Sequence, residues 1–154
     1  MAGAQKLRAV VLSLTEDKTA GENTHSLWIL EKQAEARFVS NMHELYPGHF
    51  FEGLFVENEP GKWNCEHYQT PIEKPAGIDG GMDSGNKIWF AVTINKFQPA
   101  GANRKFGSAT AKYFGEVLEG ELESTKLSAE HKKVKIQRKE IAKGDFVWMV
   151  VEVL

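Results

Sequence analysis

Basic and aromatic side chains recur together in the last third of the sequence, in the mixture that proteins use to hold single-stranded nucleic acid. Lys and Arg side chains follow the phosphates of such a strand, and aromatic rings stack on its bases at about 1 to 3 kcal/mol each. The Lys and Arg residues would contact phosphates, and an aromatic residue would stack. These predicted nucleic-acid-binding residues are Arg104, Lys105, Lys112, Tyr113, Phe114, Lys133, Lys135 and Arg138.

Residues 132–139, KKVKIQRK, indicate how a strand could carry such a surface. Side chains alternate between the two faces of a strand, so Lys133 and Lys135 share one face while Val134 and Ile136 occupy the other. The result is a basic stripe over an intact core. A structural alternative stays open, because lysines on an exposed strand also prevent edge-to-edge aggregation. The net charge of −2 predicts weak, salt-sensitive binding to nucleic acid.

No motif in the sequence predicts catalysis, a metal site or a cofactor. The glycine-rich residues 80–87 lack the Gly-Lys-Ser/Thr of a phosphate-binding loop, and a strand rather than a helix is expected after them. No Gly-x-Ser-x-Gly element is present. An enzyme would need a pocket in which His43, His49 or His67 meets a carboxylate, with the glycine-rich loop as a lid. We therefore expect a noncatalytic protein.

The composition is that of a globular protein. The 154 residues are 42% hydrophobic and 26% charged, which excludes a collagen-like, disordered or strongly basic chain and predicts a single domain over residues 1–154. A single cysteine, Cys65, cannot form an internal disulfide, and no signal-peptide pattern opens the chain. No apolar stretch approaches the roughly 20 residues of a membrane span. These features predict an intracellular protein, cytoplasmic or nuclear, without membrane contact.

The elements that would position these residues are mostly strands. Short runs rich in Val, Ile, Phe and Trp are separated by segments of turn composition, which is typical of strands. The expected strands are 7–14, 26–30, 37–40, 48–57, 61–68, 87–95, 132–138 and 145–153. The pattern predicts an all-β or β-rich α+β fold, built as a small barrel or as two packed antiparallel sheets.

Three segments are less regular. Residues 41–46 have room for one helical turn before Pro47, and residues 108–118 are balanced between a short helix and a strand. One or two short helices are therefore expected. Residues 71–86 are rich in glycine and poor in apolar side chains, which predicts a long flexible loop or an excursion between strands.

Two stretches share an order of features and suggest an internal repeat. Residues 10–57 and 117–152 each read as strand, polar loop, strand, glycine turn and strand. A true duplication would predict two related half-sheets that close on one another. The alternative is that any two β-meanders look alike, because turns favour glycine and strands favour Val and Phe.

Residues 132–153 resemble the closing strands of cold-shock and S1-like OB barrels, including those of RNB-family exoribonucleases. A basic strand there leads through a turn into a Val-rich final strand, and the matching residues are Lys143, Gly144, Asp145, Val147 and Val151. The resemblance implies an OB-like barrel and a role in binding single-stranded RNA.

Two functions follow as hypotheses. The first is a β-barrel that binds RNA or single-stranded nucleic acid through its basic and aromatic C-terminal surface. The alternative is a protein-protein interaction or self-association module of an intracellular complex, in which the chain could form a homo-oligomer. Four Trp and nine Phe residues motivate this alternative, because a surplus exposed apolar patch marks a partner site.

Overall fold

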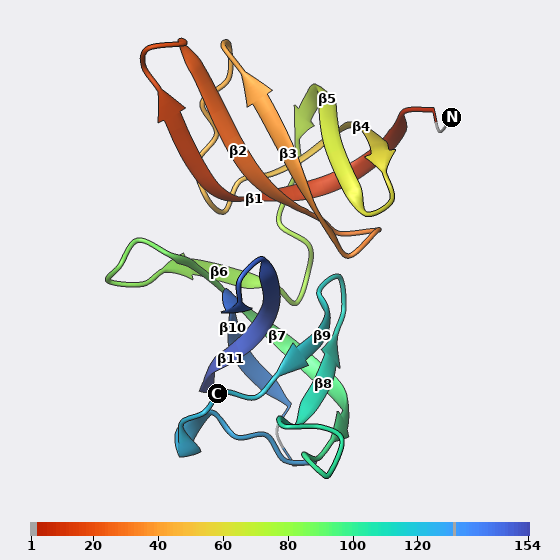
Figure 1. Ribbon diagram of the computed structural model, residues 1–154, viewed down its shortest axis with the longest axis vertical. Helices are drawn as coiled ribbons and strands as arrows, with labels where there is room; N and C mark the ends of the chain where they lie inside the picture. Colours follow the sequence, from red (N-terminus) through yellow and green to blue (C-terminus); the bar gives the residue numbers. More distant parts are fainter. Residues whose placement is uncertain (1–2, 131) are drawn as a thin grey trace. The chain divides into compact units, whose positions relative to one another are not determined.

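The computed structural model describes residues 3–130 and 132–154 and divides the chain into two compact units, residues 1–74 and 75–154. The expectation of a single domain is therefore corrected. Each unit closes a β-barrel around its own apolar interior, so that neither needs the other to complete its sheet. We refer to them as the first and the second barrel, and Figure 1 shows their strands in chain order.

The first barrel has five strands: β1 (Gln5–Asp17), β2 (Glu22–Ile29), β3 (Ala34–Ser40), β4 (Phe50–Glu59) and β5 (Lys62–Pro71). They close in the order β1-β2-β3-β5-β4, with β4 returning to β1. All neighbours are antiparallel except β3 and β5, which are parallel. Strand β1 is long enough to pair with β2 along one edge and with β4 along the other.

The core of the first barrel follows from alternation along these strands. Leu7, Ala9 and Val11 of β1 all point inward and are buried. Gly53 of β4 is required by a close backbone approach, since a β-carbon there would lie 2.5 Å from the carbonyl oxygen of His67. The pairing of β4 with β5 shifts register beside Gly53, which agrees with the bulge or close approach that the sequence predicts at this glycine.

The second barrel also closes from five strands and carries one more at its side. Its ring runs β7-β8-β9-β11-β10 and closes through β10 and β7, while β6 pairs with β7 only. Strands β9 and β11 are parallel. The elements are β6 (Asp79–Met82), β7 (Ile88–Gln98), β8 (Ser108–Ala111), β9 (Gly115–Leu118), β10 (Lys133–Ala142), β11 (Asp145–Val153) and the 3-10 helix η1 (Glu123–Thr125).

Aromatic rings fill the second barrel. Phe90 of β7 lies 5.1 Å from Phe114 and 5.8 Å from Trp148 of β11, measured between ring centroids. Val134 and Ile136 of β10 complete the interior and are fully buried. The strong apolar run in β7 thus lies in the core, as its Ile, Trp, Phe and Val content predicts.

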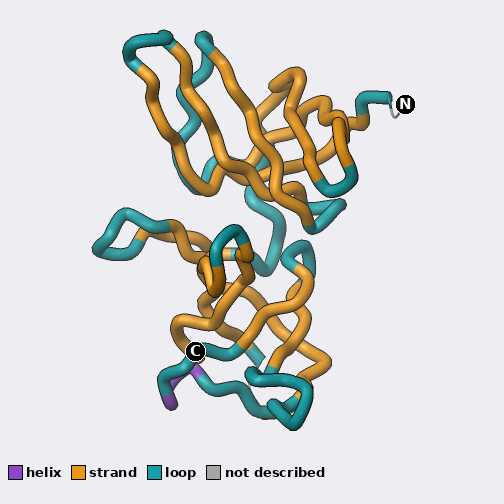
Figure 2. The backbone as a smooth tube through the Cα atoms, viewed as in Figure 1, coloured by secondary structure: helices purple, strands orange, loops and turns teal. Residues whose placement is uncertain are grey.

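Both barrels have the same connectivity. Numbered within its own unit, each runs 1-2-3-5-4 and returns to 1, with a parallel pair between strands 3 and 5. This five-stranded Greek-key arrangement is that of the OB fold. The expected all-β small barrel is confirmed, and it occurs twice (Figures 1 and 2).

The internal repeat is real in strand order, but the predicted alignment was wrong. The true correspondence joins β1–β5 with β7–β11, whereas the sequence pattern matched residues 10–57 with 117–152. That pattern set β1 against β9 and β4 against β11. Glycine turns followed by Val and Phe occur at several hairpins, so the pattern alone cannot select the register.

The three irregular segments differ from expectation at residues 41–46 and take one of the expected alternatives at residues 108–118 and 71–86. Residues 41–46 form no helix, and residues 108–118 form β8 and β9 joined by a tight turn. The only helix of the described residues is η1. Residues 71–86 contain β6, and Asp83 orders the turn after it, because its Oδ1 accepts the N–H groups of Gly85 and Lys87 at 2.8 and 3.0 Å.

The parallel pair is the shortest seam of each barrel. In the first barrel it registers Ala36 with Trp63 and Arg37 with Asn64. In the second it registers residues 148 and 149 with 117 and 118. Each antiparallel strand pair in the two five-stranded rings has more than two residue pairs in register.

Candidate nucleic-acid interface

The loop between β7 and β8, residues 99–107, holds Arg104 in a fixed position. Gly101 and Arg104 exchange both of their backbone hydrogen bonds, at 2.8 and 3.1 Å, which closes the loop on itself. The Arg104 guanidinium donates to the Ser108 hydroxyl at 2.7 Å and lies 3.6 Å from a carboxylate oxygen of Glu116. Arg104 is therefore tied to the first residues of β8 and to β9.

Phe106 lies half-buried at the end of this loop, and two lysine ammonium groups lie near its ring. The ammonium of Lys105 is 5.2 Å from the centre of the Phe106 ring, and that of Lys126 is 5.7 Å from it. Lys126 follows η1, about twenty residues along the chain, so the fold brings the two cations together. We call Arg104, Lys105, Phe106 and Lys126 the Phe106 cluster.

The carboxylate of Glu119 connects the two chain segments that form the Phe106 cluster. It accepts the N–H of Gly107 at 2.9 Å and the N–H of Leu127 at 3.0 Å, and it lies 3.8 Å from the Lys126 ammonium. Burial raises the pKa of Glu119, but the two N–H donors and the cation outweigh burial and hold its pKa below the ordinary value. Glu119 thus remains ionised and joins the segment of Phe106 to that of Lys126.

Lys112, Tyr113 and Phe114 form the turn between β8 and β9, at the other end of β8 from the Phe106 cluster. The Lys112 ammonium is 5.1 Å from the centre of the half-buried Tyr113 ring. Both residues line a hollow of about 310 Å³ together with residues 76–78 and residues 92, 93 and 95 of β7. Lys112 and Tyr113 thus keep the neighbouring cation and ring that the sequence predicts, with the cation exposed and the ring half-buried.

Phe114 cannot stack on a base. It is only 2% exposed, and its ring lies 4.9 Å from that of Trp148 in an edge-to-face arrangement. The prediction that Phe114 belongs to the binding surface was wrong, because the positive φ of 72° at Tyr113 turns the chain so that Phe114 enters the core.

Lys133 and Lys135 lie on the outer face of β10, as alternation predicts, with Val134 and Ile136 inside. Lys135 lies over the half-buried Trp89 of β7, 4.2 Å from the ring centre. Carboxylates accompany both lysines: Asp79 is 3.6 Å from Lys133, and Glu152 is 3.4 Å from Lys135.

Arg138 lies apart from these two lysines. Alternation along β10 sets Arg138 on the opposite face from Lys133 and Lys135. Arg138 pairs with Trp148 of β11, and its guanidinium carbon lies 5.4 Å from the centre of that ring. Gln137 is buried and donates to Asp83 at 2.8 Å. Arg138, although predicted as a binding residue, therefore does not extend the basic stripe that Lys133 and Lys135 form on the outer face of β10.

The predicted residues thus fall into separate groups on the second barrel. Arg104 and Lys105 belong to the Phe106 cluster, Lys112 and Tyr113 to the β8–β9 turn, and Lys133 and Lys135 to β10. Sequence reasoning missed Lys126 and Glu119, whose roles depend on contacts between distant segments, and Trp89, which reads as core. In the sequence, only the recurrence of Lys or Arg beside an aromatic residue indicates these contacts between cations and rings.

Among residues 3–130 and 132–154, no group of three His, Cys, Asp or Glu side chains could hold a metal ion. The Cys65 thiol is buried, and burial raises its pKa to about 12. The described residues form no helix of the length and hydropathy that a membrane span requires.

Comparison with known proteins identifies the chain at the level of its family. Residues 2–75 match the model described as Domain of unknown function (DUF272), N-terminal, and residues 79–154 match the corresponding C-terminal model. The boundary between the matches falls where the structure divides into two barrels. No curated protein and no solved structure gives a significant match. With both domain models matched in order along nearly its whole length, the chain belongs to the DUF272 family.

Proposed function

We propose that this protein is a noncatalytic module that binds RNA or single-stranded nucleic acid through its second barrel. The observation that carries the proposal is the Phe106 cluster, in which two lysine ammonium groups lie 5.2 and 5.7 Å from the centre of one half-buried ring. A base can stack on such a ring while the neighbouring phosphates contact the lysines and Arg104.

The position of the cluster supports the same reading. In OB barrels, oligonucleotides and oligosaccharides bind across strands 2 and 3 and the loop between strands 1 and 2. The counterparts in the second barrel are β8, β9 and the loop 99–107, which carries Arg104, Lys105 and Phe106. The resemblance of residues 132–153 to cold-shock and S1-like barrels points in the same direction and stays a prediction.

The charges of the second barrel also favour an anionic ligand. Residues 75–154 contain twelve Lys or Arg against ten Asp or Glu, although the whole chain has a net charge of −2. The ion pair between Arg104 and Glu116 is exposed on both sides, at 39% and 62%. Exposed ion pairs contribute about 0 to 1 kcal/mol, so exchanging Glu116 for a phosphate costs little.

The test is a titration of the full chain against a fluorescently labelled twelve-nucleotide oligouridine and oligothymidine at low salt. Three cations in the Phe106 cluster predict a plot of log K against log salt concentration with a slope of about −2. A Lys105→Gln/Phe106→Leu/Lys126→Gln variant should lose most of the affinity and most of that slope.

The matched control is Lys18→Gln/Lys87→Gln, which removes the same number of charges at exposed positions away from the cluster. It should bind like the wild type. Absence of binding by the wild type at low salt would refute the proposal. Equal binding by the wild type and the triple variant would move the site away from the Phe106 cluster.

The second candidate, a protein-interaction role, is favoured by a different observation on the first barrel. Val39 and Met42 line a pocket there, and their side chains are 42% and 85% exposed. The chemistry of that pocket decides which partner it fits.

A further inference from the structure

The first barrel has a pocket of about 520 Å³, within the usual range for ligand sites. The end of β3, the segment after it and β5 form most of its wall, and the start of β2 completes it. The lining residues with rings or charges are Glu22, Phe38, His43, Glu66, His67 and Tyr68.

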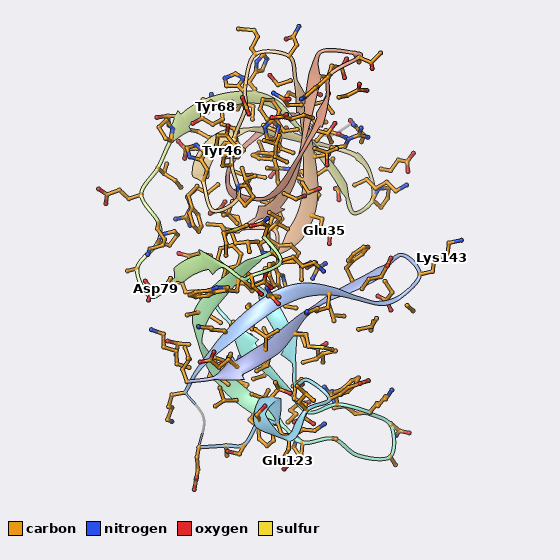
Figure 3. The ribbon with its side chains drawn as sticks, turned by 90° about the vertical axis from the view of Figure 1, so that its left-hand side faces the viewer. Glu35, Tyr46, Tyr68, Asp79, Glu123 and Lys143 are labelled. Carbon is orange, nitrogen blue, oxygen red and sulfur yellow. The ribbon has the colours of Figure 1, made fainter. Side chains whose placement is uncertain are left out.

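One wall of the pocket is a row of aromatic rings. His43 lies 4.9 Å from Tyr68 and 5.6 Å from Phe38, measured between ring centroids. The Tyr68 hydroxyl is hydrogen-bonded to Nε2 of His49 at 2.8 Å, and His49 does not line the pocket. Tyr68 is labelled in Figure 3, where it extends from β5 within the first barrel. The π faces of such rings attract cations.

Hydrogen bonds fix this wall in place before any ligand arrives. The Ser40 hydroxyl oxygen accepts the N–H groups of Met42 and His43, both at 3.0 Å, and lies 3.2 Å from Nδ1 of His43. Asn23 donates to the carbonyl oxygen of His43 at 2.8 Å. A wall that is already ordered costs little entropy when a partner binds.

Hydrogen bonds of the buried His25 hold Phe38 and the segment after β3 in place as well. His25 is fully buried, and its Nδ1 lies 2.9 Å from the carbonyl oxygen of Phe38, while its Nε2 accepts the N–H of Leu45 at 3.0 Å. These bonds leave one neutral tautomer, with the proton on Nδ1. The His25 ring also stacks on Phe38 at 5.3 Å.

The charge of the pocket is negative. Glu22 and Glu66 are exposed at its edge, and no Lys or Arg is among the described residues that line it. The surrounding unit agrees, since residues 1–74 contain seven Lys or Arg against eleven Asp or Glu. Carboxylates beside aromatic rings repel phosphate and favour a cation, so this pocket and the Phe106 cluster suit opposite ligands.

We propose that the pocket of the first barrel binds an arginine side chain from a peptide segment of a protein partner. A planar guanidinium stacks on rings such as those of Tyr68 and His43, and it forms paired hydrogen bonds with carboxylates such as Glu22 or Glu66. Met42 and Val39, exposed beside these groups, fit an apolar residue next to the arginine in the partner. This is an interaction site distinct from the proposed nucleic-acid surface.

The surroundings of His43 favour binding over acid-base catalysis. His43 Nδ1 is engaged by Ser40 rather than by a carboxylate. An acid-base pair would need an imidazole within hydrogen-bonding distance of a carboxyl group or of the substrate. The arrangement of rings and carboxylates serves binding.

The experiment uses the full chain and a fluorescein-labelled peptide Gly-Leu-Arg-Gly-Leu-Arg-Gly, followed by fluorescence anisotropy. Its comparison peptides carry citrulline, which is neutral and of nearly the same shape, or lysine in place of arginine. The arginine peptide should bind at least about tenfold more tightly than the citrulline peptide, since charge-assisted hydrogen bonds contribute about 1.5 to 3 kcal/mol. The affinity of the lysine peptide should lie between those of the arginine and citrulline peptides.

The variant that tests the pocket is Glu22→Gln/Glu66→Gln, and its matched control is Glu59→Gln/Glu73→Gln, which removes two exposed carboxylates elsewhere in the same unit. The pocket variant should lose about tenfold in affinity for the arginine peptide, and the control should lose none. Far-UV circular dichroism establishes that each variant is folded.

Three outcomes would overturn the proposal. They are equal binding of the arginine and citrulline peptides, no binding of any peptide, and equal loss in the pocket variant and its control. Loss of oligouridine binding in the pocket variant would instead assign the pocket to nucleic acid. Because these variants leave the Phe106 cluster untouched, the two proposals succeed or fail separately.

Discussion

Phe114 meets Trp148 edge to face, with 4.9 Å between the ring centroids, inside the second barrel. This contact assigns Phe114 to the core, eight residues along the chain from a phenylalanine that belongs to the candidate surface. The two residues therefore form a natural pair for separating stability from binding.

We expect Phe114→Ala to destabilise the second barrel by about 3 to 5 kcal/mol, because it leaves a cavity beside Phe90 and Trp148. Phe106→Ala should cost much less stability and should weaken oligonucleotide binding instead. Hydrogen exchange measured on the amides of β7 and β10 follows the stability of this unit. Equal destabilisation by the two substitutions would contradict the assignment of Phe106 to the surface.

Glu119→Gln should loosen the loop that carries Phe106. An amide can accept one of the N–H groups of Gly107 and Leu127 but presents its own N–H₂ to the other, which costs about 1 to 3 kcal/mol. We expect the variant to have a lower free energy of unfolding and a lower affinity for oligonucleotides than the wild type. A crystal structure of the variant with both hydrogen bonds intact would count against this account.

The same carboxylate predicts a dependence on acidic pH. The pKa of Glu119 is lowered in the folded state, so the unfolded chain binds more protons at acidic pH. The stability that Glu119 contributes is present above its ordinary pKa of 4.5 and is lost as the pH falls through the lowered value. Urea titrations between pH 6 and about pH 3 should show a smaller loss in Glu119→Gln than in the wild type.

His25 predicts a loss of stability at a higher pH. Burial lowers its pKa below 6.5, and the neighbouring His43 adds to this, although the hydrogen bond to Phe38 opposes it. Protonation would set an N–H of His25 against the N–H of Leu45. The stability that neutral His25 contributes is complete above pH 6.5 and is lost as the pH falls through the lowered value.

The check is the urea midpoint of the first barrel at pH 7.5 and at pH 5.5, for the wild type and for His25→Phe, with the pH values chosen about one unit on each side of the ordinary value. The variant keeps a ring beside Phe38 but should be less stable at pH 7.5, since the Phe38 carbonyl and the Leu45 N–H both lose their partner. Its change with pH should be smaller than that of the wild type. Some change should remain, because burial also lowers the pKa of His49. An unchanged pH dependence would show that His25 does not titrate in this range.

The two units should fold separately. Each has a closed ring of strands and its own buried residues, so fragments 1–74 and 75–154 should each give dispersed amide signals in NMR and a cooperative urea transition. Domains of this size bury only about 60% of their unfolded surface, so modest stabilities are expected. A fragment that is unfolded in isolation would show that its core requires the other unit.

Local patterns in the sequence predicted the strands well and the domain count badly. The alternation around Val134 and Ile136 and the apolar run of β7 are local features, and the structure bears them out. The division into two barrels depends on which strands pair, for example β4 with β1 and β10 with β7. Pairing over such distances leaves no local signal, so 154 residues read as one domain.

In the candidate site, too, contacts between neighbours in the sequence were predicted and contacts between distant segments were not. The lysines that lie beside aromatic neighbours in sequence, Lys105 and Lys112, keep those neighbours in the structure. Lys126 reaches Phe106 only because Glu119 joins two segments, and no spacing rule predicts that contact. Phe114 was misassigned because a turn with positive φ reverses which side chains face inward.

The short parallel seam has a consequence for motion within each barrel. With only two residue pairs in register between β3 and β5, and two between β9 and β11, these contacts cost least to break. Partial opening should therefore begin there, with amide hydrogens of the seam exchanging before those of the long antiparallel ladders. An opened seam presents two unpaired strand edges, so each barrel has a defined place where a strand from another chain can add.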